Sequence, residues 1–348
     1  MKALVTGGAG FIGSHLTEAL LESGHSVIAL DNMSTGRIEN VEQLSGRRDY
    51  ELVVGDVRDD ALVASLVNRV DVIFHLAAAL GVKHVVERPV HTIETNVGGT
   101  ETVLRQASEQ KKLVLVASTS EVYGKGTALP FREDADLVLG NPTKTRWGYA
   151  TSKLIDEFLA LAYWKEHKSP VIVVRFFNTV GPRQNPQYGM VLPNFVRSAL
   201  AGLPLTVHGN GLQTRSFTWV GDVVWAMTQL IEEPRAVGQI FNIGNGAEIS
   251  IRDLASTVKA IAGSSSKISF AEYSEVFGED FEDMARRVPD IAKLRKLIGY
   301  EPQVHLDEII VRVIDYCLDQ PEFSSEAAVS ALPPALRFTR EVALPLAG

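Results

Sequence analysis

The chain has 348 residues, 45% of them hydrophobic and 22% charged, and a formal net charge of −8. Such a length and composition are typical of a globular protein with two lobes and a sizeable core. The acidic charge argues against a general nucleic-acid binder. The single cysteine, Cys317, leaves no pair for an intramolecular disulfide, which fits a cytoplasmic location. No apolar run approaches membrane-spanning length, so no membrane partner is expected.

Short apolar runs alternate with helical patterns through the first half of the chain. The runs show no polar alternation, as expected for parallel strands covered on both faces. They predict strands at 3–6, 26–30, 51–54, 72–76, 113–116 and 171–174. A helical pattern through Leu16, Leu20 and Leu21 follows the first of them. Strands that alternate with helices predict an α/β fold, a doubly wound parallel sheet of the Rossmann type.

The composition of the sequence and the length of its predicted elements change after about residue 176. Gly, Pro, Asn and Gln cluster at 181–186, which indicates a loop, and shorter elements follow. We expect residues 1–175 to form the sheet domain. Residues 176–320 are expected to form a smaller C-terminal lobe over the carboxyl edge of the sheet, with some interleaving. Residues 321–348, rich in Pro, Ala and Ser, are expected to be an extension without an assigned function.

A glycine-rich turn joins the first predicted strand to the first predicted helix. Gly7, Gly10 and Gly13 permit a tight turn and a close approach to a pyrophosphate, and the helix N-terminus offers free N–H groups to the anion. Asp31 ends the second strand, where its carboxylate can accept hydrogen bonds from ribose hydroxyls and repels a 2′-phosphate. This pattern predicts NAD rather than NADP. Asp56, after the third strand, is expected beside the adenine or as a helix cap.

Tyr149 and Lys153 are four residues apart, which places both on one face of a helix. A nearby ammonium favours the phenolate form of a tyrosine, so the pair can take a proton from a sugar hydroxyl. Hydroxyl side chains follow the strand that ends near Val116, where ligands bind in such sheets. Among them, Thr119 is predicted to bind the reacting hydroxyl.

Together these motifs resemble the extended short-chain dehydrogenases/reductases that modify nucleotide sugars. The resemblance runs from residue 1 to about 320. It rests on the glycine turn, Asp31, residues 118–124, the Tyr149–Lys153 pair and residues 175–183. It implies that the C4 hydroxyl of the sugar is oxidised, that the 4-keto sugar reacts, and that the hydride usually returns. It also implies a bound NAD and a homodimer formed through two helices of each subunit.

The resemblance further implies two sets of binding residues, and no metal site is expected. The cofactor contacts are Gly7, Gly10, Phe11, Ile12, Gly13, Asp31, Asn32, Asp56, Val57, Leu76, Ala77, Ala78, Asn96, Ser118, Tyr149, Lys153 and Phe176. The substrate contacts are Thr119, Ser120, Asn178, Arg183, Arg215 and Arg287. Guanidinium groups bind diphosphate oxygens well, so Arg215 and one of the two arginines Arg286 and Arg287 are expected to hold the diphosphate. His75 is interpreted as structural.

The chemistry after C4 oxidation is indicated by Glu121 and Arg287. Thr119-Ser120-Glu121 matches the pattern of UDP-glucuronate decarboxylases, and GDP-mannose dehydratases share it. The segments 287–290 and 146–149 also resemble decarboxylase segments. We therefore favour a UDP-glucuronate decarboxylase with Glu121 as a catalytic residue. A UDP-sugar 4-epimerase and a 4,6-dehydratase stay open as alternatives. A non-catalytic NAD-sensing protein is disfavoured by the joint presence of Tyr149, Lys153 and Thr119.

Overall fold

The computed structural model describes residues 1–81, 85, 87–186, 190–273 and 282–323. Its centre is a seven-stranded parallel sheet with the strand order β11-β6-β5-β4-β1-β2-β3. The strands are β1 (Lys2–Thr6), β2 (Ser26–Asp31), β3 (Tyr50–Val54), β4 (Val72–His75), β5 (Leu113–Thr119), β6 (Val171–Phe176) and β11 (Gln239–Ile243). The predicted Rossmann-type sheet and its six predicted strands are confirmed.

Helices cover both faces of this sheet. One face carries α1 (Phe11–Glu22), α7 (Val220–Ile231) and α10 (Ala292–Ile298), and the other carries α2 (Asp60–Val67), α4 (Pro89–Glu109) and α5 (Arg146–His167). Neighbouring residues of one strand enter opposite cores: Leu115 packs with the first group and Val114 with the second. This explains why the strands are continuously apolar. No described helix has the length and hydrophobicity to cross a membrane.

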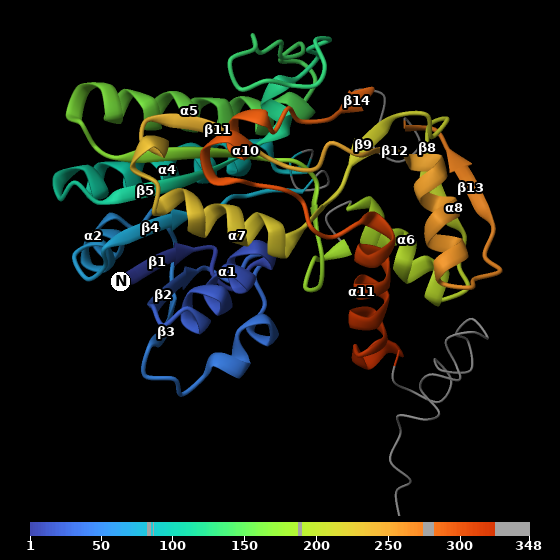
Figure 1. The fold of residues 1–348 in the computed structure, drawn as a ribbon, viewed down its shortest axis with the longest axis horizontal. Coiled ribbons are helices and arrows are strands. Elements are labelled where there is room, and N and C mark those ends of the chain that lie inside the picture. Colours follow the sequence, from blue (N-terminus) through green and yellow to red (C-terminus); the bar gives the residue numbers. More distant parts are fainter. Residues whose placement is uncertain (82–84, 86, 187–189, 274–281, 324–348) are drawn as a thin grey trace, which may run out of the picture.

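A third core lies beside the sheet, and we call the elements around it the helical lobe. It contains α6 (Val191–Leu200), α8 (Ile251–Ile261) and α11 (Leu306–Leu318), with the parallel pair β8 (Leu205–His208) and β13 (Ile268–Ala271). Figure 1 shows these elements gathered at one end of the molecule, away from α2. The short sheet β12-β9-β14 consists of β12 (Glu248–Ser250), β9 (Thr214–Ser216) and β14 (Arg286–Arg287). β7 (Thr179–Val180) pairs with β10 (Thr218–Trp219).

The chain returns from the helical lobe to the sheet. After β10 it forms α7 and then β11, which pairs in parallel with β6 and becomes the edge strand. Residues beyond 175 therefore complete the sheet. Of the expected C-terminal extension, Pro321–Phe323 forms a single 3-10 turn, and the rest lies outside the described residues.

Candidate active site

A cavity of about 670 Å³ opens at the carboxyl ends of the parallel strands. Its wall includes Gly7 after β1, Asp31 at the end of β2, Leu76 after β4 and Thr119 at the end of β5. Residues of the helical lobe, such as Phe195 on α6, complete it. In open α/β sheets this edge is where ligands bind, because loops and helix N-termini converge there.

The glycine turn forms a cradle with no room for side chains. Gly7 has φ +72°, a conformation that glycine adopts without strain. A Cβ atom on Gly13 would lie 2.0 Å from the carbonyl oxygen of Gly7, so any larger residue would push the turn apart. Gly10 precedes α1 without a side-chain cap, and the first residues of α1 line the cavity. Their N–H groups suit a pyrophosphate, so the residues present fit a dinucleotide cofactor.

Asp31 reaches the cavity from the end of β2. Its carboxylate accepts hydrogen bonds from the backbone N–H groups of Ala9 (3.0 Å) and Met33 (2.9 Å). Burial raises its pKa, and these hydrogen bonds oppose the shift. The loop that follows was missed by the sequence reasoning: its Arg37 lines the cavity, as do Ser34 and Thr35. Gly36 was the available signal for this loop. A Cβ atom at that position would lie 2.7 Å from an Asp31 carboxylate oxygen, so the loop backbone passes close to Asp31.

Two of the predicted cofactor contacts, Asp56 and Asn96, are not among the described residues that line the cavity. Asp56 is bound by Arg58 (2.9 and 2.8 Å), which lowers its pKa, and it accepts a hydrogen bond from the Asn32 amide (3.1 Å). The Asn96 amide accepts a hydrogen bond from the Ala79 N–H (2.7 Å) and so supports the cavity wall from behind. The others line the cavity: Gly7, Gly10, Phe11, Ile12, Gly13, Asp31, Asn32, Val57, Leu76, Ala77, Ala78, Ser118, Tyr149, Lys153 and Phe176.

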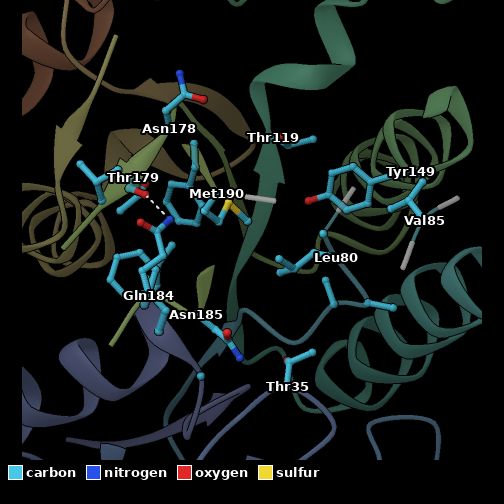
Figure 2. A pocket seen from close by; sticks show the side chains of 18 of the residues that line it. Thr35, Leu80, Val85, Thr119, Tyr149, Asn178, Thr179, Gln184, Asn185 and Met190 are labelled. Atoms are coloured by element: carbon cyan, nitrogen blue, oxygen red, sulfur yellow. Dashed lines mark hydrogen bonds between the residues drawn. The ribbon is translucent and has the colours of Figure 1, made fainter. Parts of the chain in front are cut away.

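Tyr149 and Thr119 meet on the cavity wall. Figure 2 shows the Tyr149 hydroxyl directed into the cavity, with Thr119 on β5 close to it and Asn178 across from it. Burial raises the pKa of Tyr149, Glu121 raises it further, and a hydrogen bond with Thr119 lowers it. The phenol is therefore protonated in the free chain. Lys153, one turn further along α5, is buried and also lines the cavity.

Glu121 and Arg287 form an ion pair beside this tyrosine. The distance from Glu121 Oε1 to Arg287 Nη1 is 3.2 Å, and Arg287 Nη2 donates a hydrogen bond to Asn178 Oδ1 (2.7 Å). Burial and the neighbouring Arg215 lower the pKa of Arg287 to about 10. The guanidinium thus stays protonated at neutral pH but is a stronger acid than an exposed arginine. The structure therefore brings Glu121 and Arg287 together on the wall of the cavity.

A second acid, Asp283, binds two buried arginines. Its Oδ1 lies 2.8 Å from Arg215 Nη2 and 3.0 Å from Arg146 Nη2, and all three residues line the cavity. Burial alone would raise the pKa of Asp283, but Arg215 and Arg146 hold it below its ordinary value. Arg146 and Asp283 were not predicted as site residues. The position of Arg146, one helical turn before Tyr149, was the available signal.

The remaining predicted substrate residues lie at different parts of the wall. Ser120 and Arg183 both line the cavity. The Arg183 guanidinium is bound by both carboxylate oxygens of Glu18 on α1 (2.8 Å each). Arg183 is thus tied to the helix that follows the glycine turn. The Ser118 hydroxyl donates a hydrogen bond to Glu157 (2.5 Å).

Comparisons with known proteins show which family the chain is similar to. A family model described as GDP-mannose 4,6 dehydratase matches residues 4–313. A UDP-N-acetyl-alpha-D-glucosaminuronate decarboxylase of Bacillus cytotoxicus is 42% identical over 316 residues, which are 90% of this chain and 97% of the relative. UDP-glucuronic acid decarboxylase 1 of Xenopus tropicalis is 39% identical over 315 residues, 90% of this chain and 72% of the relative.

A solved structure is similar over nearly the same range. It is a UDP-glucuronic acid 4-epimerase of Bacillus cereus in complex with UDP-glucuronic acid and NAD, with a TM-score of 0.82 and 29% identity, covering 91% of this chain and 98% of that one. The resemblance found in the sequence is thereby confirmed. The chain belongs to the GDP-mannose 4,6 dehydratase family of extended short-chain dehydrogenases/reductases, and it is an NAD-dependent enzyme that modifies a nucleotide sugar.

Proposed function

We propose that this enzyme decarboxylates a UDP-linked uronic acid. The observation that carries the proposal is the Glu121–Arg287 ion pair (3.2 Å) next to Tyr149, with Arg146 also facing Glu121 (3.7 Å). An epimerase needs room for its 4-keto sugar to turn, and one that acts on a uronic acid must also bind the carboxylate, but neither needs a second acid to protonate C5. The decarboxylase names of the two relatives support the proposal.

The residues present suit the chemistry of such a substrate. NAD, when bound, would oxidise the C4 hydroxyl and later reduce the ketone, and Tyr149 would accept and return the hydroxyl proton. The 4-keto uronate is a β-keto acid, so its C5–C6 bond breaks with the electron pair moving into the C4 oxygen and CO₂ leaving. Tyr149 stabilises the enolate oxygen. Glu121 and Arg287 are proposed to direct a proton to C5, and Arg215 to bind the diphosphate.

The proposal is tested by supplying candidate sugars to the purified enzyme with NAD. UDP-glucuronate and UDP-N-acetylglucosaminuronate differ only at C2, so both are included. At least one of them is expected to release CO₂ and to yield a UDP-pentose, as followed by mass spectrometry and NMR. If the UDP-uronate instead changes its C4 configuration and keeps its mass, the enzyme is a 4-epimerase and the decarboxylase proposal fails.

Cofactor choice gives a separate prediction at Asp31. Its carboxylate lines the cavity at the end of β2, where it would repel a 2′-phosphate. Purified protein is expected to bind NAD more tightly than NADP. Asp31→Ser should narrow this preference: the dissociation constant for NADP divided by that for NAD should fall by roughly tenfold, or about 1.4 kcal/mol. Calorimetric titration measures both constants, and Asp49→Ser, at the exposed partner of Arg47, is the matched control. Equal affinities of the unchanged protein for both cofactors would contradict this role.

We further propose that two parts of the chain bind different ligands. Residues 1–175 would hold NAD and residues 176–320 the nucleotide sugar, with α7 and β11 as the part that returns to the sheet. This division is supported by the separation of the helical-lobe core from the cores on the two faces of the sheet. Saturation transfer from UDP to isotope-labelled methyl groups of the helical lobe tests it, because UDP contacts confined to residues 1–175 would contradict it.

A cytoplasmic homodimer is our proposal for assembly and location. Exposed apolar side chains gather on two packed helices, with Val90 and Ile93 on α4 and Ile155 and Phe158 on α5. Such a patch suits burial against a second copy. The lone Cys317 is compatible with a reducing compartment. A light-scattering mass of one chain would contradict the dimer, and recovery in a membrane or extracellular fraction would contradict the location.

A further inference from the structure

A buried ion pair joins Lys153 to an acid that the mechanism does not use. Lys153 Nζ lies 2.6 Å from Asp156 Oδ2, and the two side chains are 3% and 0% exposed. Carboxylates are almost never fully buried unless they are paired. Burying both charges costs free energy that apolar residues of the same volume would not cost. A charge pair placed directly beside the catalytic tyrosine therefore indicates a role in the active site.

Lys153 also lies near a series of buried polar side chains that are hydrogen-bonded to one another in the sheet. His75 Nδ1 lies 2.9 Å from Thr6 Oγ1, and His75 Nε2 lies 3.0 Å from Thr100 Oγ1. Thr6 Oγ1 accepts a hydrogen bond from the Ala77 N–H (3.2 Å), at the cavity wall. Burial lowers the pKa of His75 to about 3, and Lys153 adds to the shift. His75 is thus neutral and adds no second positive charge beside Lys153, whose ammonium is paired with Asp156.

The order of these residues along α5 defines what Asp156 can do. Tyr149 precedes Lys153 by four residues and Asp156 follows it by three, so all three lie along one face of the helix. A carboxylate in contact with the ammonium offsets the positive charge that reaches the tyrosine. Resting on the proposed roles of Tyr149 and Lys153, we propose that Asp156 is a positioning residue that holds the Lys153 ammonium and limits its charge at Tyr149.

Other charges act on Tyr149 from the elements packed around it. Burial raises its pKa, Glu121 after β5 and Asp156 on α5 raise it further, and Arg287 on β14 lowers it, as does the hydrogen bond with Thr119. Glu121 is paired with Arg287 and Asp156 with Lys153. Removing the Asp156 charge leaves the ammonium uncompensated, and this favours the phenolate. Removing that charge also removes the unfavourable interaction of Asp156 with the phenolate, so we expect the pKa of Tyr149 to fall.

The test is Asp156→Asn, which keeps the shape of the side chain and removes its charge. Phenolate absorbance is titrated in purified protein without a nucleotide sugar, and Tyr149→Phe in the same background isolates the signal of Tyr149. The phenolate midpoint is expected to move to lower pH by about one unit, the size of shift that a nearby buried charge produces. In turnover measurements, the acidic limb of the pH profile moves in the same direction.

Glu157 offers a matched control, because it is the adjacent buried acid on the same helix. It binds Arg175 (2.7 and 2.9 Å) instead of Lys153. Glu157→Gln should lower the melting temperature but leave the Tyr149 midpoint in place. Asp156→Ser is a second neutral variant and must shift the Tyr149 midpoint in the same way. If Asp156→Asn does not fold, the test is made with Asp156→Ser. An unmoved midpoint in the neutral variants, or an equal shift in Glu157→Gln, overturns the proposal. The titration needs no substrate, so it stays decisive if the decarboxylase proposal fails.

Discussion

Tyr149→Phe is expected to reduce turnover by at least ~10²-fold, the low end of the effect of a positioned acid–base group. The change keeps the ring on the cavity wall and removes only the hydroxyl that points into the cavity. Proton transfer from the C4 hydroxyl then lacks its acceptor. Affinity for the nucleotide sugar should stay within a few fold, because Arg215 and Arg287 are untouched. Steady-state kinetics and a titration with UDP separate the two effects.

Tyr163→Phe is the matched control, since Tyr163 lies further along the same helix, packs against His167 and is not among the described residues that line the cavity. This variant should react at close to the wild-type rate. Near wild-type turnover by Tyr149→Phe would remove Tyr149 from the mechanism.

Glu121→Gln and Arg287→Ala are expected to slow steady-state CO₂ production by about 10²-fold or more each, because an enzyme whose enolate is not protonated at C5 cannot begin another turnover. Each change breaks the same 3.2 Å ion pair. The oxidation step uses Tyr149 and precedes decarboxylation. The reduced cofactor should therefore accumulate in Glu121→Gln, and its absorbance should rise. Stopped-flow absorbance and labelled CO₂ measure the two steps separately.

The neighbouring Arg286 supplies the control for this pair of variants. Its side chain is 53% exposed and binds Glu248 at the surface. Arg286→Ala should therefore release CO₂ at close to the wild-type rate. Equal losses in Arg286→Ala and Arg287→Ala would point to damage of β14 and not to a role in the cavity.

The sheet could be predicted because both of its faces are buried. Each strand of the first half needs apolar residues on both sides, so Val114 and Leu115 alike mark β5. β11 lacked this signal. It is an edge strand that contains Asn242, which is fully buried and satisfied by Tyr123 (2.8 Å) and by the Phe131 carbonyl (2.9 Å). Local patterns do not show that a polar residue will find such distant partners.

The site was predictable where its residues form local motifs and not where distant segments meet. The glycine turn, Asp31 and the Tyr149–Lys153 pair are set by spacing within one element. Asp283 acquires its place only when the segment before β14 folds against α5 and β9. Asp156 shares a helix with Lys153, but its complete burial depends on the packing of α4 against α5. That long-range packing leaves no mark on the helical pattern.

The return of the chain to the sheet has a consequence for how the protein is made. β6 pairs with β5 on one side and with β11 on the other, and β11 begins only at Gln239. Until that residue has left the ribosome, the backbone groups along one edge of β6 have no strand to bind. An open strand edge is a template for aggregation. The Rossmann half of this nascent chain therefore cannot close as a finished unit ahead of the remainder. α6 and β8 must emerge first, and their synthesis sets the time for which that edge stays exposed.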